Sequence, residues 1–446
     1  MSEFSNSLYH HPVLKALADS IFVKKCAVKI RFIFAVAVLI SSPCAVFAQA
    51  TIKQQAVADV ITQHALANRF PNMLTFVDTR GKQRQGLVEY TFDPEVHSSM
   101  AEVYLKYQPD YACFVAMDVE TGAILNLTSF IKSDEEFENL VMRADYPAAS
   151  VFKVITAAAG LDSGAVGPST VIPYNGKSTS LYKKQVLNHK KNKWTRNPTF
   201  EESFAKSINA VFGRIGVYDL GAEKLSDYAE RFGFNQAIKT DFSLPVSQIN
   251  LDLNDQWARA EAASGYTKDV KLSPIHAAQI AATIANEGRL VTPYMVEAIR
   301  DAKGRAMYQH IEDPKPPQLI SSKSADELKQ LMRATTRIGS ARKSFTNLSR
   351  YRVYRDMEIG GKTGSLTGYS PRGRHDWFVG YAQKDGRKVA YASLIINKEK
   401  WYVRSAYVAR QFIYNYFTAI EENKKQQREL EQKEKDAVAN NQASAK

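Results

Sequence analysis

Three short strings of residues, which follow one another along the chain, constrain it more than any other feature. They supply a serine that can act as a nucleophile, lysines that can take and return its proton, and a strand edge that can hold a peptide-like substrate. The ordered set therefore predicts a single acyl-transfer site. The strings are Ser150-Val151-Phe152-Lys153, Ser207-Ile208-Asn209 and Lys362-Thr363-Gly364.

Each string is weak when it stands alone, because a serine three residues before a lysine also occurs elsewhere in this basic chain. The other pairs are Ser180 with Lys183, Ser203 with Lys206 and Ser340 with Lys343. Only Ser150 follows a proline-alanine run and opens an alanine-rich stretch, which predicts a helix that begins at the serine. Lys153 then projects from the same face of that helix. The surroundings of Ser180 and Ser340 indicate solvated surface instead.

The composition is that of a globular protein of 446 residues with a formal net charge of +13. This length suffices for one large domain or two. The basic residues are scattered, and the chain lacks a nucleic-acid-binding motif, a dinucleotide-binding glycine pattern and a phosphate loop. We interpret the charge as favouring solubility and attraction to an anionic envelope or membrane surface, and we expect no nucleic-acid partner.

Residues 1–48 have the pattern of a secretory signal peptide. Basic residues from Lys24 to Arg31 precede an apolar run at 32–40, and small residues suit cleavage after Ala48. The apolar run is shorter than the ~20 residues of a comfortable membrane span. We predict an exported protein of the periplasm or cell envelope, with the segment either cleaved or retained as an anchor. Cleavage would leave Cys113 as the only cysteine, so no intrachain disulfide is expected.

Apolar periodicity divides the remainder into a strand-rich beginning, a helical middle at 149–296 and a strand-rich end. Strands are predicted at 86–92, 113–119, 123–130, 351–363, 377–383 and 389–396, and helices at 51–69, 95–107, 325–336 and 403–420. The tail after residue 421 has few apolar residues and predicts a frayed helix that runs into disorder. We expect an α+β protein with a helix/strand pedestal at 49–93, a main domain at 94–422 and a charged tail at 423–446.

Several longer segments surround or accompany the three strings. They are 115–125, 205–212, 272–279, 284–288, 360–365 and 377–381. With these segments, residues 86–417 resemble the transpeptidase domain of high-molecular-mass penicillin-binding proteins. The resemblance implies a β-lactamase/transpeptidase-like fold, in which helices flank a five-stranded antiparallel sheet and a mostly helical lobe is inserted. It also implies a peptidoglycan D,D-transpeptidase that forms a serine acyl-enzyme with D-Ala-D-Ala stem peptides and with β-lactams.

The resemblance implies a role for each of the four polar residues of the first two strings. Ser150 is the expected nucleophile, and Lys153 is the expected base. Ser207 would relay the proton between Lys153, Lys362 and the leaving nitrogen, while Asn209 would bind the substrate amide. The residues themselves support one further expectation. A lysine in a tight site beside a second cation loses the solvation that favours its charged form, so the pKa of Lys153 should fall.

The third string and the residues after it are implied to bind the substrate. Lys362 and Thr363 would take its terminal carboxylate. The backbone N–H of Ser365, with that of the nucleophile, would hold the oxyanion. The strand around Gly364 would pair with the extended peptide, and Thr367 is a further expected substrate contact.

Other polar residues have ordinary structural interpretations. His276 lies on an apolar helical stripe and is expected to pack in the core. His375 and Asp376 stand together at the start of a strand and are expected at the surface, and His189 lies among lysines in a loop. No set of residues has the spacing of metal ligands, so neither a metal nor a cofactor is expected.

Two alternatives to the transpeptidase remain open. A class D-like serine β-lactamase would use a carboxylated Lys153 and hydrolyse the acyl-enzyme rapidly. A β-lactam sensor or scaffold would be acylated without turnover. A class A enzyme is disfavoured, because no glutamate lies four residues before an asparagine between the second and third strings. The expected partners are peptidoglycan stem peptides, β-lactam antibiotics and other cell-wall synthesis proteins.

Overall fold

The computed structural model describes residues 51–133, 139–238 and 240–444, with side chains as far as residue 437. The segment predicted as a signal peptide lies outside these ranges, so its function stays a prediction. Within them, no helix combines the length and apolar character that a membrane crossing requires.

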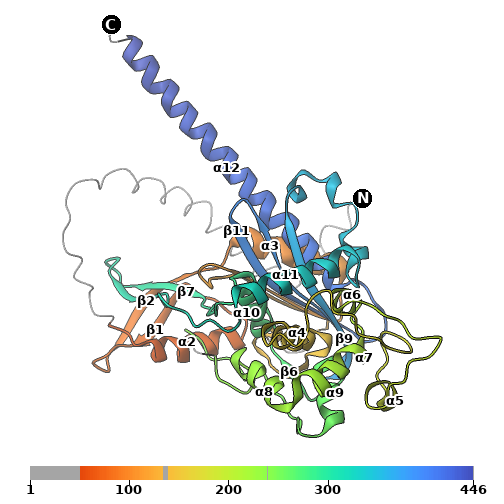
Figure 1. Cartoon of the computed structure of the whole chain (residues 1–446). Coiled ribbons are helices and arrows are strands. Elements are labelled where there is room, and N and C mark those ends of the chain that lie inside the picture. Colours follow the sequence, from red (N-terminus) through yellow and green to blue (C-terminus); the bar gives the residue numbers. More distant parts are fainter. Residues whose placement is uncertain (1–50, 134–138, 239, 445–446) are drawn as a thin grey trace, which may run out of the picture. The chain divides into compact units, whose positions relative to one another are not determined.

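A five-stranded antiparallel sheet forms the centre of the fold, as predicted (Figure 1). Its strand order is β4-β3-β11-β10-β9, so β9 is an edge strand. Strand β9 begins later than predicted, because the chain before it forms short 3₁₀ turns. The strands are β3 (Tyr111–Asp118), β4 (Ile124–Ile131), β9 (Glu358–Tyr369), β10 (Arg372–Lys384) and β11 (Arg387–Asn397).

Alternate residues of the central strands face two separate apolar layers. Trp377 and Val379 of β10 pack into the first layer, whereas Phe378 between them packs into the second. This period of two is the geometry of a strand that is buried on both faces. The first layer contains α4 (Lys153–Asp162), α10 (Pro274–Ala285) and α11 (Ser322–Arg337), and the second contains α3 (Pro94–Tyr107) and α12 (Ser405–Ser444).

The inserted lobe is mostly helical, as predicted, and two of its helices, α8 (Gly221–Arg231) and α9 (Gln256–Ser264), contact α4. Two buried phenylalanines, Phe200 and Phe204, each contact the buried ring of Phe212 in its interior. A short pair of strands, β5 (Tyr146–Pro147) and β6 (Lys271–Leu272), closes the lobe just before Ser150. The lobe helices are α5 (Lys183–Val186), α6 (Phe200–Ala205), α7 (Asn209–Arg214), α8 (Gly221–Arg231) and α9 (Gln256–Ser264).

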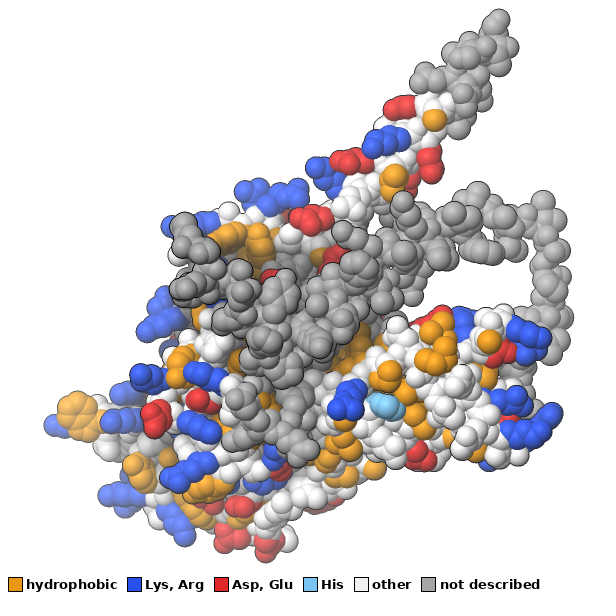
Figure 2. Space-filling view, turned by 180° about the vertical axis from the view of Figure 1, so that it is seen from behind, with side chains coloured by type: hydrophobic (Ala, Val, Ile, Leu, Met, Phe, Trp, Pro, Cys, Tyr) orange, Lys and Arg blue, Asp and Glu red, His pale blue; other side chains and the backbone are white. Residues whose placement is uncertain are grey.

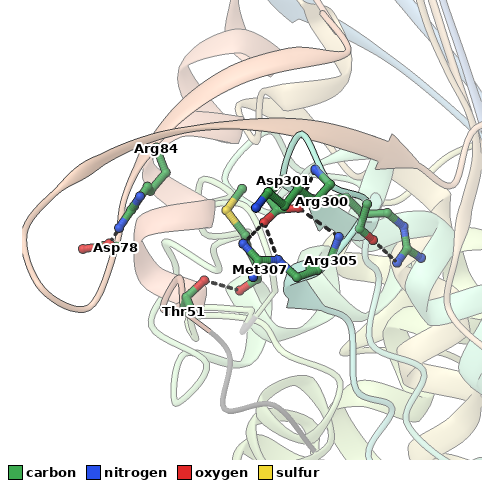
Figure 3. A network of polar contacts seen from close by, with 9 residues as sticks. Thr51, Asp78, Arg84, Arg300, Asp301, Arg305 and Met307 are labelled. Atoms are coloured by element: carbon green, nitrogen blue, oxygen red, sulfur yellow. Dashed lines mark hydrogen bonds and ion pairs between the residues drawn. The ribbon is translucent and has the colours of Figure 1, made fainter.

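A second sheet, of order β1-β2-β7-β8, lies beside α2 (Gln54–Leu66) (Figure 1). The sequence predicted only one of its strands, because the others are short and show little periodicity. Strands β7 and β8 come from the predicted main domain, so this sheet joins that domain to the predicted pedestal. Figure 3 shows one such link, in which the Thr51 hydroxyl donates to the Met307 carbonyl oxygen at 3.4 Å. The strands are β1 (Met73–Val77), β2 (Gln83–Tyr90), β7 (Val296–Arg300) and β8 (Ala306–Gln309).

Helix α12 is one continuous helix of 40 residues, so the tail that was predicted as a frayed helix running into disorder is helical as far as residue 444. Its apolar residues as far as Phe417 pack against the central sheet. At the point where it leaves the sheet, the Glu421 carboxylate pairs with Lys384 at 2.8 Å and with Arg352 at 2.7 Å. Beyond this point the side chains to residue 437 are exposed, and acidic and basic groups alternate along the helix (Figure 2). Strong helix formers and pairs such as Lys425 with Glu429 sustain it without a core.

Candidate active site

The turn that carries Ser150 is held from two sides. Ser150 lies in a short 3₁₀ turn that leads directly into α4, in keeping with the predicted helix start. The Trp377 indole N–H donates to the Pro147 carbonyl oxygen at 3.0 Å, which ties the turn to β10. On the other side, a Cβ atom at Gly265 would lie 1.9 Å from the Ala149 carbonyl oxygen. Only glycine therefore fits at position 265.

Lys153 is completely buried, and its amine has three hydrogen-bond partners. The Nζ atom lies 2.8 Å from Ser150 Oγ, 2.7 Å from Asn209 Oδ1 and 2.5 Å from the Ser264 carbonyl oxygen. Three partners satisfy the three N–H groups of an ammonium. When the amine is neutral, Asn209 and Ser264 accept its two N–H groups and the lone pair faces the Ser150 hydroxyl.

The surroundings of Lys153 favour this neutral form. Burial lowers its pKa well below the ordinary value for a lysine, and the nearby charge of Lys362 lowers it further. The direction agrees with the expectation from the sequence. Burial is the larger cause, because an ammonium inside the protein loses its hydration.

Lys362 is also completely buried, and burial lowers its pKa to about 7. Its Nζ donates to Ser207 Oγ and to the Thr363 carbonyl oxygen, each at 2.9 Å. Ser207 has a backbone φ of +56°, a conformation uncommon outside glycine, and this conformation accompanies its contact with Lys362. Among the described contacts, Ser207 bonds to Lys362 and not to Lys153.

Asn209 was expected to bind the substrate amide, but both polar atoms of its side-chain amide already have hydrogen-bond partners within the protein. Its Oδ1 accepts from Lys153, and its Nδ2 donates to the Thr179 carbonyl oxygen at 2.9 Å. Its backbone N–H donates to the Ser178 carbonyl oxygen at 2.8 Å. In this arrangement Asn209 positions the lysine, and its binding of the substrate amide stays a prediction.

The expected carboxylate-binding strand lies close to the nucleophile. A Cβ atom at Gly364 would lie 3.0 Å from Val151 Cγ2 and 3.2 Å from the Val151 backbone nitrogen, so β9 approaches the Ser150 turn closely. Thr363, Ser365 and Thr367 alternate with inward-facing residues, and their side chains share the other face of the strand.

Two side chains that were given no role in the site by the sequence contact this row of hydroxyls. The Ser340 Oγ atom lies 2.5 Å from Thr363 Oγ1, and Arg374 Nε donates to Ser365 Oγ at 2.7 Å. Ser340 is exposed, as predicted, but it is not merely solvated surface. Its backbone N–H donates to the Ala205 carbonyl oxygen at 2.9 Å, which connects the second and third strings.

Of the three histidines with predicted positions, His189 and His276 are where they were expected, since His189 lies in a loop. His276 is buried, and its Nε2 lies 2.6 Å from the Phe232 carbonyl oxygen, so its interpretation as a packing residue is confirmed. The prediction of surface for His375 and Asp376 is wrong, since both are buried in β10. Asp376 accepts from the Ser405 backbone N–H at 3.0 Å and so anchors the start of α12. In the described part of the chain, no three His, Cys, Asp or Glu side chains form a cluster that could hold a metal ion.

Comparison with known proteins agrees with this fold. Residues 112–415 match the family model of the penicillin-binding protein transpeptidase domain. The chain is 27% identical over 381 residues to peptidoglycan D,D-transpeptidase PbpA of Mycolicibacterium smegmatis, covering 77% of this chain and 73% of that protein. It is 26% identical over 323 residues to stage V sporulation protein D of Bacillus subtilis, covering 65% of this chain and 47% of that protein.

Solved structures show the same fold. The D,D-transpeptidase domain of a peptidoglycan glycosyltransferase from Eggerthella lenta superposes with a TM-score of 0.62 at 20% identity, covering 79% of this chain and 96% of that domain. Penicillin-binding protein A of Mycobacterium tuberculosis superposes with a TM-score of 0.60 at 23% identity, covering 74% of this chain and 82% of that chain.

The fold, the buried serine–lysine site and the family match define a serine acyl-transferase of the penicillin-recognising class. The chain belongs to the penicillin-binding protein transpeptidase family. It is therefore an enzyme, and the D,D-transpeptidase reaction is the activity of that family.

Proposed function

We propose that this protein cross-links peptidoglycan by way of an acyl-enzyme on Ser150. The donor would be a stem peptide ending in D-Ala-D-Ala, and the acceptor would be an amine of a neighbouring stem peptide. β-Lactams would acylate the same serine. The observation that supports this most directly is the 2.8 Å contact between Ser150 Oγ and Lys153 Nζ, because a buried amine of lowered pKa can serve as the base.

In the acylation step, Ser150 Oγ attacks the carbonyl carbon of the penultimate D-Ala. The hydroxyl proton passes to the lone pair of Lys153, whose two N–H groups stay bonded to Asn209 and Ser264. When the tetrahedral intermediate collapses, the C–N bond breaks and the leaving D-Ala nitrogen takes a proton. That proton would come either directly from Lys153, which took it from Ser150, or from the Ser207 hydroxyl, which Lys362 would then reprotonate. The acceptor amine then displaces Ser150 by the reverse sequence.

The oxyanion and the terminal carboxylate would be held by β9 and the Ser150 turn. Backbone N–H groups of Ser150 and Ser365 would hold the oxyanion, an effect typically worth about 3–4 kcal/mol for each donor. Lys362 and the hydroxyl of Thr363 would take the carboxylate. The unpaired edge of β9 supports binding of the peptide as an added strand.

Labelling with a fluorescent penicillin tests the nucleophile. A peptide map of the adduct should place the label on Ser150, and Ser150→Ala should abolish labelling. Ser180→Ala and Ser203→Ala are matched controls, because each removes the serine of another serine–lysine pair. Both variants should still be labelled by the penicillin. Label on any serine other than Ser150 would overturn the assignment.

The fate of the acyl group separates this proposal from the two alternatives. A transpeptidase should hold the penicilloyl group for many minutes and should join a D-Ala-D-Ala peptide to an added amine. Release within seconds in buffer with bicarbonate, which maintains a carboxylated lysine, would indicate a β-lactamase. A stable adduct with no turnover of any peptide would indicate a sensor.

A further inference from the structure

A basic segment of the lobe contacts a residue of the active site but takes no part in the chemistry described above. No Asp or Glu occurs between Asp162 and Glu201. Within this stretch, the segment 177–196 carries seven cations in 20 residues, and we refer to it as the basic loop. The seven are Lys177, Lys183, Lys184, Lys190, Lys191, Lys193 and Arg196.

The charge of the basic loop is not neutralised within the protein. All seven cationic residues are exposed. In the described part of the chain none of them forms a salt bridge, whereas other surface cations, such as Arg231 with Asp227, do. Lys183 interacts with the Glu261 carboxylate over a longer distance. Seven charges of one sign within a short loop create a positive potential that attracts anions over about 8 Å at physiological salt.

The loop is anchored, so these charges have defined positions. Leu181 and Val186 are buried against Val217 and Ala260 in a small apolar cluster of their own. The Tyr218 hydroxyl donates to the Leu187 carbonyl oxygen at 3.0 Å. Figure 1 shows α5 within this loop, at the side of the molecule where α7 and α9 lie. The loop is thus a fixed part of the lobe surface.

The basic loop is also joined to the catalytic residues. The Ser178 carbonyl oxygen accepts a hydrogen bond from the backbone N–H of Asn209, and the Thr179 carbonyl oxygen accepts one from its side-chain Nδ2. The Oδ1 atom of the same asparagine accepts from Lys153. A ligand that lies along the loop therefore runs up to the active site. This position favours a ligand that is continuous with the substrate.

Two exposed aromatic side chains stand among the cations. Tyr182 is 62% exposed and Trp194 is 72% exposed, although such rings are usually more buried. Lys193 lies over the Trp194 ring, 5.3 Å from its centre. Rigid amphipathic rings beside cations suit a ligand that combines apolar faces with negative charge.

We propose that the basic loop binds the peptidoglycan strand outside the reacting peptide, through the free carboxylates of its stem peptides. This inference rests on the proposed function, because it takes a peptide-bearing polysaccharide as the substrate. The polymer supplies many carboxylates on one chain, and the loop supplies exposed cations on a segment whose backbone contacts Asn209 of the site. The enzyme would thereby prefer polymeric donor strands to isolated peptides.

Binding to purified, insoluble peptidoglycan tests the inference. The test variant replaces Lys184, Lys190, Lys191 and Lys193 with Gln. Sedimentation at increasing amounts of peptidoglycan in 50 mM salt should show that this variant needs about tenfold more polymer than wild type for half-maximal binding. Wild-type binding should weaken steeply between 50 and 500 mM salt.

A control variant removes the same charge elsewhere. It replaces Lys53, Lys82, Lys303 and Lys315 with Gln; all four are exposed and lie around the small sheet. It should bind peptidoglycan within about twofold of wild type. Unfolding midpoints measured for all three proteins show whether the variants are folded.

The ligand chemistry is tested with two further probes. Wild type should bind peptidoglycan weakly once the carboxylates of the polymer have been amidated. This affinity should be similar to that of the test variant for untreated polymer. Vesicles of equal parts phosphatidylglycerol and phosphatidylcholine distinguish a membrane surface. Equal binding of untreated polymer by test variant and wild type would overturn the inference, as would loop-dependent binding to the vesicles alone. Wild-type labelling by penicillin on Ser150 is scored separately, so failure of the proposed function is recognised on its own.

Discussion

The hydroxyl oxygens of Ser340 and Thr363 lie 2.5 Å apart, although the two residues belong to different segments of the chain. Since Thr363 is expected to bind the substrate carboxylate, a proton donated by Ser340 would leave the Thr363 proton free for that carboxylate. The backbone of Ser340 is held by Ala205, which precedes the string that contains Ser207. Ser340 is thus placed as a positioning residue for Thr363.

Ser340→Ala should mainly weaken recognition. Loss of one neutral hydrogen bond should raise the penicillin concentration for half-maximal acylation by about 3- to 10-fold, with a smaller change in the limiting acylation rate. Ser340→Thr keeps the hydroxyl and should restore most of the loss. Stopped-flow acylation over a range of penicillin concentrations separates the two parameters. A fall in the limiting rate alone would contradict a positioning role.

The two buried lysines should differ in their effect on the pH dependence of acylation. Lys153→Ala should slow acylation by about 100-fold or more near neutral pH, because no neighbour replaces the base. Lys362→Ala removes a positive charge that lowers the pKa of Lys153. The rising limb of its pH–rate profile should therefore move to higher pH.

Acylation rates measured from pH 6 to pH 10 check this prediction. Lys206→Ala is the matched control, because Lys206 lies near the same site but is exposed and paired with Glu202. Its profile should coincide with that of wild type. An unmoved profile in Lys362→Ala would mean that the charge of Lys362 does not tune the base.

Burial of Lys362 should cost stability at neutral pH. Its pKa is about 7 in the folded protein and about 10.5 for an ordinary lysine, so the unfolded chain binds more protons between these values. The free energy of unfolding of wild type therefore gains a contribution that rises with pH across this window and is lost below it. Lys362→Met has no such contribution.

The difference in unfolding midpoint, Lys362→Met minus wild type, should thus be most positive at or below pH 7 and should decline toward pH 10.5. Thermal unfolding at several pH values measures it. Groups whose pKa does not depend on Lys362 cancel, and the rise in the pKa of Lys153 on removal of Lys362 changes the difference in the same direction. Lys343→Met, at an exposed lysine, should give a difference that does not vary with pH. A Lys362→Met difference that is constant from pH 6 to pH 10.5 would contradict a buried lysine of lowered pKa.

Export is predicted from residues 1–48, which lie outside the described ranges. Protein recovered from the periplasm should have a mature N-terminus at Gln49, or should retain the segment as an anchor. Intact-mass measurement distinguishes these two forms. Full-length protein confined to the cytoplasm would refute export.

The central sheet could be predicted from the sequence because its strands are long and strongly apolar. The small sheet could not, since β8 has only four residues and pairs with segments far away in the chain. His375 was misplaced because its burial depends on the layers packed over β10, which its neighbours in sequence do not reveal. The tail was predicted as a frayed helix, but the length of that helix was not, because charged residues can sustain a helix without burying an apolar face.

The sequence by itself determined the chemical groups of the site: the serine, the two lysines and their order along the chain. Only the tertiary structure decided their states and partners. Lys153 is a candidate base because the fold buries it, and Ser264 supports it through a backbone carbonyl that any residue type would carry. Ser340 contacts Thr363 from a loop whose sequence has no pattern that predicts this contact. Burial and backbone contacts depend on what packs around a residue, and the residue's own identity does not encode them.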